Sequence, residues 1–181
     1  MAQALAVGLE GLRELGEVEL TSRVDPAGLR AQWNAQLPPE LKILRAWEAP
    51  LQGPSLSAGV RGATYQVRFL PNGWDPAPLA ALGNAGACAE FLAQGPIPVE
   101  VYKKGQMVTL DARPFVQEFT AMPQDGCLQW GLVLRAGLGG SVKPQTVMRR
   151  FLEQRVPPGE LDRMISSLRI TRTALALEGQ G

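Results

Sequence analysis

Residues 64–70 read TYQVRFL, and this stretch decides the fold class of the second half of the chain. Apolar and polar residues alternate in it with a period of two, which is typical of a half-buried β-strand. The alanine-rich residues 76–93 follow and predict a helix, which Gly83 and Gly86 weaken. A strand followed by a helix indicates an α/β arrangement.

The remainder of this half also predicts strands and helices in turn. Residues 98–103 and 106–110 predict two strands joined by a turn at Lys104-Gly105. Residues 115–119 predict a short helical or edge segment. Later patterns predict a strand at 128–135, a helix near 144–154 and a strand at 167–173. The order approximates β-α-β-β-α-β, the ferredoxin-like split βαβ unit.

The first half predicts part of the same unit. Residues 17–20 alternate as a strand, and residues 41–47 predict another. Between them, residues 26–37 predict an amphipathic helix that begins after the capping residue Asp25. The opening strand and helix of the unit are missing. We therefore expect an α+β protein with two ferredoxin-like sandwiches, the first of them incomplete.

These patterns also give domain boundaries. We expect an incomplete half at 1–52, a linker at 53–62, a second half at 63–176 and a disordered tail at 177–181. An incomplete sheet has an edge with unpaired backbone groups. We expect that edge to be covered by residues 1–10 or by a second molecule.

Composition excludes several classes of function. The 181 residues include no histidine, so the chain by itself cannot form a Ser-His-Asp site or the usual histidine-containing zinc site. Cys88 and Cys127 lie too far apart for a CxxC motif, and we expect both to be structural. There is no signal peptide and no apolar run of membrane-spanning length, which predicts a cytoplasmic protein with no membrane partner. The net charge of +1 gives no overall attraction for nucleic acid.

The first candidate site lies around the predicted hairpin. Lys103 and Lys104 precede its turn, and Asp111 and Arg113 follow its second strand. Together they could bind a phosphate or carboxylate, with Arg113 as the bidentate contact. The alternative is a solvated turn with a structural Asp–Arg pair.

The second candidate is the glycine-rich loop before the helix near 144–154. Gly139, Gly140 and Ser141 could bring backbone N–H groups close to an anion at the start of that helix. The loop lacks the GxxxxGK[ST] pattern of a nucleotide-binding loop. The alternative is a flexible turn.

The third candidate is a basic face in the C-terminal segment. Residues 143–172 hold seven Lys and Arg against three acids, a net charge of +4. This asymmetry predicts a face for nucleic acid or an acidic partner. Its proposed members are Lys143, Arg149, Arg150, Arg169 and Arg172. Aromatic residues on strands would add to an RNA-binding surface, although they are more often core residues; they are Tyr65, Phe69, Tyr102 and Trp130.

Several longer stretches carry a family resemblance. The first half contributes VGLEGLRELGEVELTSRVDPAGLRAQWNAQLPPELKILRAWEAP (7–50), PSLSA (54–58) and TYQVRF (64–69). The second half contributes VEVYKKGQMVTLDARPFV (99–116), GSVKPQTVM (140–148) and LRITRTAL (168–175). Taken in order, these stretches resemble the DUF2344 family of radical SAM-associated proteins.

The resemblance implies a context more than an activity. Family members are encoded beside B12-binding radical SAM proteins or fused to them. The chain lacks the CxxxCxxC motif that ligates a radical SAM cluster. We therefore expect a non-catalytic accessory or substrate-presenting domain, with a B12-binding radical SAM protein as its partner and no metal or cofactor of its own. The alternatives are an RNA-binding module and, third, an enzyme with a lysine- or carboxylate-based site.

The resemblance also predicts a segment before Met1. Family members usually begin with a further strand and a basic helix, and this upstream part carries histidine in SHLD-like and GFxPHP-like patterns. We therefore expect this chain to be a fragment, which would also account for its missing histidine.

Overall fold

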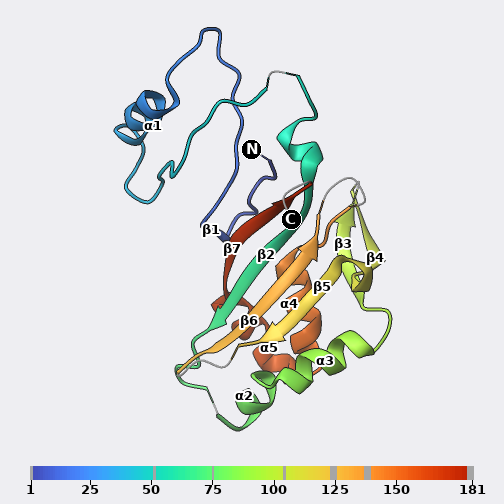
Figure 1. The fold of residues 1–181 in the computed structure, drawn as a ribbon. Coiled ribbons are helices and arrows are strands. Elements are labelled where there is room, and N and C mark those ends of the chain that lie inside the picture. The colour runs from blue at the N-terminus through green and yellow to red at the C-terminus, as the bar shows by residue number, and fades with distance from the viewer. Residues whose placement is uncertain are drawn as a thin grey trace.

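A computed structural model describes residues 2–50, 52–74, 76–103, 105–122, 126–136 and 140–178. Its central feature is a five-stranded sheet with the strand order β1-β7-β2-β6-β5 (Figure 1). The strands are β1 (Glu10–Gly11), β2 (Val60–Phe69), β5 (Val116–Ala121), β6 (Leu128–Arg135) and β7 (Arg169–Leu177). The three strands predicted at 64–70, 128–135 and 167–173 are thus confirmed, with small shifts of their ends.

Strand β2 lies in the middle of this sheet. It pairs antiparallel with β6 on one side and with β7 on the other, and β6 pairs antiparallel with β5. Tyr65, Val67 and Phe69 point to the core and are at most 6% exposed. The alternation that predicted the strand therefore records one buried face and one open face.

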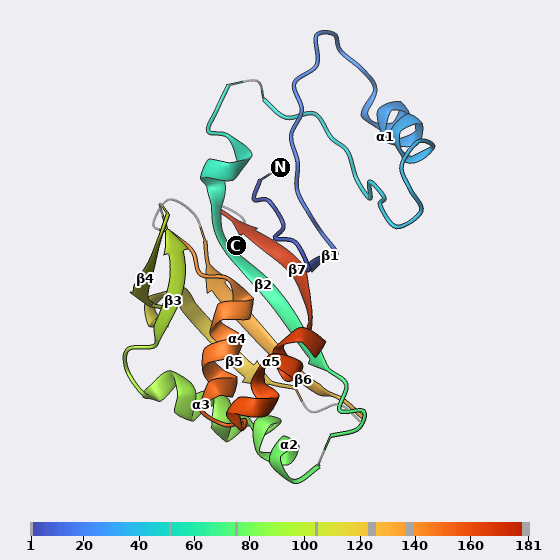
Figure 2. The same ribbon diagram turned by 180° about the vertical axis from the view of Figure 1, so that it is seen from behind.

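Helices cover one face of the sheet (Figure 2). α2 (Pro76–Leu82) and α3 (Ala85–Ala93) follow β2, whereas α4 (Pro144–Glu153) and α5 (Pro158–Ser167) connect β6 to β7. The helix expected near 144–154 is confirmed as α4. The single helix expected at 76–93 is instead broken at Gly83, because the Asn84 side chain accepts a hydrogen bond from Gly86 N (2.8 Å) and caps a new helix.

The core lies between this sheet and the helices. The Phe151 ring of α4 packs edge-on against the rings of Phe91 and Phe119, with centroids 5.5 and 4.9 Å away. Trp130 also packs against it, and the Trp130 indole N–H donates to Leu82 O (3.1 Å). Aromatic packing therefore joins α3, α4, β5 and β6.

The predicted hairpin is confirmed as a separate two-stranded sheet. β3 (Pro98–Lys103) pairs antiparallel with β4 (Gln106–Asp111). Gly105 in its turn has a φ of 83°, a conformation that glycine adopts without strain. After it, the short 3₁₀ helix η2 (Arg113–Phe115) leads into β5 at the edge of the main sheet, which agrees with the edge segment expected at 115–119.

The first half differs from the prediction. The helix expected at 26–37 is confirmed, as α1 (Pro26–Asn34), and Asp25 accepts hydrogen bonds from two N–H groups of its first turn. The strands expected at 17–20 and 41–47 are wrong, because neither segment has a strand partner among the described residues. Both segments are largely exposed, so their alternation separates no core face from a solvent face.

The α+β class itself is confirmed. The described residues form five α-helices and two sheets, with a second 3₁₀ helix, η1 (Leu56–Gly59), before β2. Residues 10–12 pair with the β7 edge: Glu10 faces Thr171, Gly11 faces Arg172, and Leu12 N donates to Arg172 O (3.0 Å). The expected covering of a first-half sheet edge by residues 1–10 is therefore wrong, because the described residues of the first half form no sheet of their own and residues 10–12 extend the second-half sheet.

The expected disordered tail begins with ordered residues. Leu177 is the last residue of β7, and Glu178 N donates to Gly59 O (2.8 Å). The Glu178 carboxylate also forms an ion pair with Arg61. The other residues of that segment, 179–181, lie outside the described ranges.

Candidate functional site

The most unusual surface belongs to residues 16–50, which we call the arm. The arm projects from the sheet and contains α1 (Figures 1 and 2). None of its residues is buried. Seven of its large apolar side chains are between 38% and 64% exposed: Val18, Leu20, Val24, Trp33, Leu41, Leu44 and Trp47. Exposed apolar side chains gathered on one segment are typical of an interaction surface.

Polar contacts, not a core, give the arm its shape. The Asn34 side chain donates to Ile43 O (3.0 Å) and accepts from Ile43 N (2.7 Å), which ties the end of α1 to the returning chain. The Arg23 guanidinium makes two hydrogen bonds to the Glu48 carboxylate (2.9 and 3.2 Å) and closes the base of the arm. This bidentate ion pair also raises the pKa of Arg23. The apolar side chains are therefore presented on a segment that already has a defined course.

A second feature fastens the chain before the arm, residues 2–15, which we call the strap. Arg172 of β7 is 2% exposed and is the one charged side chain buried among the described residues. Its guanidinium donates to the Glu14 carboxylate (2.8 Å from Nε) and to Gln3 O (2.8 Å). Burial by itself lowers the pKa of Arg172, but the hydrogen bonds and charge of Glu14 outweigh burial and hold it above its usual value. The neighbouring Tyr65 is also buried, which raises its pKa.

The structure uses the residues around the hairpin for backbone contacts. The Asp111 carboxylate accepts from Ile97 N (2.7 Å) and Arg113 N (2.9 Å). The Arg113 guanidinium donates to Leu92 O (3.0 Å) and Val116 O (3.1 Å). Lys103 is exposed, and Lys104 lies outside the described residues. Asp111 and Arg113 thus brace the chain between α3 and β5, and anion binding by this group stays a prediction.

The glycine-rich loop is only partly described, because Gly139 lies outside the described residues. Gly140 has a φ of 104°, and a side chain there would lie 3.5 Å from the Phe115 ring. Ser141 is exposed, and Lys143, the residue before α4, makes no side-chain capping bond. The positive φ is by itself a conformational reason for glycine at position 140, and anion binding at this loop stays a prediction.

Three of the five residues proposed for the basic face have acidic partners in the structure. Arg149 pairs with Asp162 (2.6 Å) and Arg150 with Glu153 (3.4 Å), whereas Lys143 and Arg169 are exposed. Placing Arg172 on this face was wrong, because the guanidinium is buried against Glu14 and the strap.

Most of the aromatic residues considered for RNA binding are buried. Tyr65, Phe69 and Trp130 are at most 6% exposed and belong to the core, as the alternative interpretation had it. Tyr102 is 73% exposed, but it lies on the separate hairpin. RNA binding stays a prediction without a stacking surface on the main sheet.

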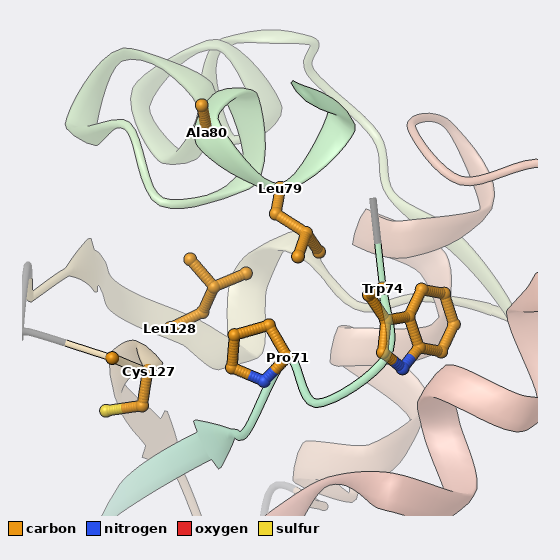
Figure 3. Close-up of a pocket in the computed structure, with 7 residues that line it drawn as sticks. Pro71, Trp74, Leu79, Ala80, Cys127 and Leu128 are labelled. Atoms are coloured by element: carbon orange, nitrogen blue, oxygen red, sulfur yellow. The ribbon is translucent and has the colours of Figure 1, made fainter. Parts of the chain in front are cut away.

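A hollow of about 320 Å³ lies beside the start of α2 (Figure 3). Arg163 lies over the Trp74 ring at its rim, 4.6 Å from the ring centroid. The hollow is lined by Pro71, Trp74, Leu79, Ala80, Gly126, Cys127 and Leu128. These residues offer apolar contact, and Cys127 is the one side chain among them that can titrate. The lining therefore supplies no acid–base pair.

Two absences apply to the described residues alone. No group of three or more His, Cys, Asp and Glu side chains among them could hold a metal ion. None of their helices has the length and apolar character needed to cross a membrane.

Cys88 is expected to react very slowly in the native protein. Burial raises the pKa of its thiol to about 11, although nearby Arg155 opposes this. At pH 8 the thiolate fraction is then about 0.1%, against about 10% for a thiol of pKa 9, so alkylation by iodoacetamide should be at least about 100-fold slower than that of an ordinary cysteine. Mass spectrometry of the peptide that contains Cys88 measures the rate.

The control for Cys88 is the same protein in urea, where the thiol should react at the ordinary rate. Because the folded pKa is the higher one, this group supports stability below about pH 9 and loses that contribution as the pH rises toward 11. Equal alkylation rates in the native and unfolded protein would show that the thiol is accessible.

Sequence reasoning missed the arm surface and the Arg172–Glu14 pair. The apolar residues of the arm follow strand and helix periods in the sequence, which predicted buried faces, and only the structure shows that these side chains are exposed. Nothing in the sequence pairs Glu14 with Arg172, which is 158 positions away.

Comparison with known proteins gave one match. A family model described as "Uncharacterized protein conserved in bacteria (DUF2344)" matches residues 1–144. No curated protein matches, and no solved structure matches. The match spans the strap, the arm, the hairpin and every strand except β7.

Proposed function

The chain belongs to the DUF2344 family, and from this premise we propose that it is a non-catalytic accessory or substrate-presenting domain that docks onto a partner protein through its arm. The partner that the family resemblance implies is a B12-binding radical SAM protein. The observation that carries the proposal is the seven exposed apolar side chains of the arm. Large exposed apolar patches on a protein mark interaction sites, and all seven of these side chains belong to one segment.

The way in which the arm is held supports docking as well. Arg23–Glu48 and Asn34–Ile43 link the outgoing and returning parts of the arm without a partner. Ordering a flexible segment costs free energy on association, and a segment with a defined course avoids part of that cost. Trp33 and Trp47 lie among the exposed side chains, and tryptophan is enriched among the residues that dominate binding energy.

The platform behind the arm is proposed to be a ferredoxin-like split βαβ unit. Its support is the order β7-β2-β6-β5, in which all neighbours are antiparallel, with helices on the connections from β2 to β5 and from β6 to β7. The hairpin β3–β4 would then be an insertion before the second strand of the unit. Such a platform would hold the strap and arm at one edge.

Replacing Trp47 by alanine is expected to weaken partner binding by about 30-fold or more, because a central aromatic anchor contributes about 2 kcal/mol or more. Trp47 is 64% exposed, so the free energy of unfolding should change by less than about 0.5 kcal/mol. The measurement is the affinity for a B12-binding radical SAM protein of the same organism, by co-purification and then calorimetry.

The matched control is Tyr102→Ala, which removes an aromatic ring that is 73% exposed on the hairpin, away from the arm. This variant should bind as the unchanged protein does. Absence of any complex with the radical SAM protein would overturn the choice of partner. An equal loss for Trp47→Ala and Tyr102→Ala would overturn the arm as the docking surface.

A further inference from the structure

Two arginines lie side by side on the open face of the main sheet. Arg68 of β2 is directly opposite Arg169 of β7 and, on its other side, Gln129 of β6. The neighbouring residues Val67 and Ile170 are buried in the core, so the two arginines point away from the helices. Figures 1 and 2 together show that the helices cover only the opposite face.

Neither arginine has a counter-ion in the described part of the chain. Both are exposed, and no ion pair or hydrogen bond involves either guanidinium among the described residues. Arg61, further along the same strand, shows the contrast, because it pairs with Glu178. Like charges directly opposite each other destabilise a sheet, and their side chains begin only about 5 Å apart.

The row next to the arginines adds polar groups, and the Met122 side chain lies over its glycine, Gly131. Gln66 of β2 lies opposite Thr171 of β7 and Gly131 of β6. The Thr171 hydroxyl donates to the carboxylate of Glu10 (3.1 Å), which lies on β1, one strand further out. The side-chain amide Nε2 of Gln129 donates a hydrogen bond to the sulfur of Met122 (3.8 Å). The amide groups of Gln66 and Gln129 can therefore donate to an anion held by the arginines.

We propose that this row, which we define as Arg68, Arg169 and Gln129, binds a phosphate group. Two unpaired positive charges match a phosphate dianion, and binding would remove the repulsion between them. Each guanidinium presents N–H donors in a planar fork, which suits the several oxygens of a phosphate. The row is separate from the arm, so this site neither needs nor excludes docking of a partner.

The test is a titration of the ¹⁵N-labelled protein with inorganic pyrophosphate at low salt. NMR spectra of the backbone N–H and arginine Nε–H groups monitor the titration. We expect saturable shifts around Arg68 and Arg169. Arg68→Gln and Arg169→Gln should each weaken binding by at least about tenfold, since each removes a charged hydrogen-bonding group. Both variants should be at least as stable as the unchanged protein, because the repulsion is relieved.

The matched control is Arg135→Gln, which removes an exposed arginine at the opposite end of β6. Arg135 pairs with Gly62, six residues from Arg68 along β2, or about 20 Å. This variant should keep the full affinity. Absence of saturation, or an equal loss for Arg135→Gln, would overturn the site, because either result indicates unspecific attraction to positive charge.

Two further ligands distinguish the sources of the phosphate. A nucleoside monophosphate tests a small phosphate ester, and a single-stranded oligonucleotide tests a nucleic-acid backbone. Binding of the monophosphate with the same dependence on Arg68 and Arg169 supports a small-molecule site. Binding of the oligonucleotide alone, with a steep salt dependence, supports a backbone contact. If the protein binds neither of these ligands and does not bind pyrophosphate, the proposal is overturned.

Discussion

Replacing Phe151 by alanine is expected to destabilise the fold by about 3–5 kcal/mol, the largest effect of any single substitution considered for this protein. Phe151 is fully buried, and its ring contacts three other aromatic rings, those of Phe91, Phe119 and Trp130. Alanine would leave a cavity where α3, α4 and the sheet meet. Urea unfolding followed by circular dichroism measures the change in the free energy of unfolding.

A domain of ordinary stability, about 5–15 kcal/mol, could lose most of its folded population through this change. Phe151→Leu keeps most of the volume and should cost less than about 1.5 kcal/mol, so it gives a readable result even if the alanine variant does not fold. Tyr102→Ala on the exposed hairpin is the surface control. A loss below about 1 kcal/mol for Phe151→Ala would show that this aromatic cluster does not hold the core together.

Replacing Glu14 by alanine is expected to cost about 2–3 kcal/mol. The substitution leaves the buried guanidinium of Arg172 without its carboxylate, and breaking a buried ion pair from one side commonly costs about 3–5 kcal/mol. The lower range applies because the Glu14 side chain itself is 21% exposed. Urea unfolding measures the loss, and amide hydrogen exchange at residues 10–12 should become faster because the strap is released.

The matched control for Glu14 is an exposed ion pair of the same kind. Asp162→Ala breaks the contact with Arg149, in which the side chains are 83% and 44% exposed. Exposed pairs are worth no more than about 1 kcal/mol. Equal losses for Glu14→Ala and Asp162→Ala would contradict the view that the strap is fastened by a buried charge.

The sequence predicts elements well where burial on one side leaves a clear period. The strand at 64–70 and the helix near 144–154 are of this kind, since each has one face in the core. α5 was missed, although Leu161, Met164 and Ile165 follow a helical spacing, because the run Pro157-Pro158-Gly159 at its start is typical of a turn. The strands expected at 17–20 and 41–47 failed because alternation reports amphipathic character and cannot show that a partner strand exists.

The candidate sites depend on contacts that a single sequence does not contain. Arg169 and Arg172 are three positions apart and are the same residue type, yet Arg172 is buried against Glu14 and Arg169 is exposed. The row of Arg68 and Arg169 appears only once the register of β2 and β7 is known. Local pattern predicted that these residues lie on or near strands, and long-range pairing decided what each of them can bind.

The pairing of the strap with β7 also determines when the main sheet can form during synthesis of the chain. Its residues 10–12 pair with β7, and β2 needs β7 along one whole side. The ribosome therefore releases the strap, the arm and β2 well before their partner strand exists. Contacts that span most of the chain form late and slowly, because the intervening chain must first be brought together. Until β7 emerges, the apolar side chains of the arm and the unpaired side of β2 are exposed together, and exposed strand edges of this kind favour aggregation at that stage of synthesis.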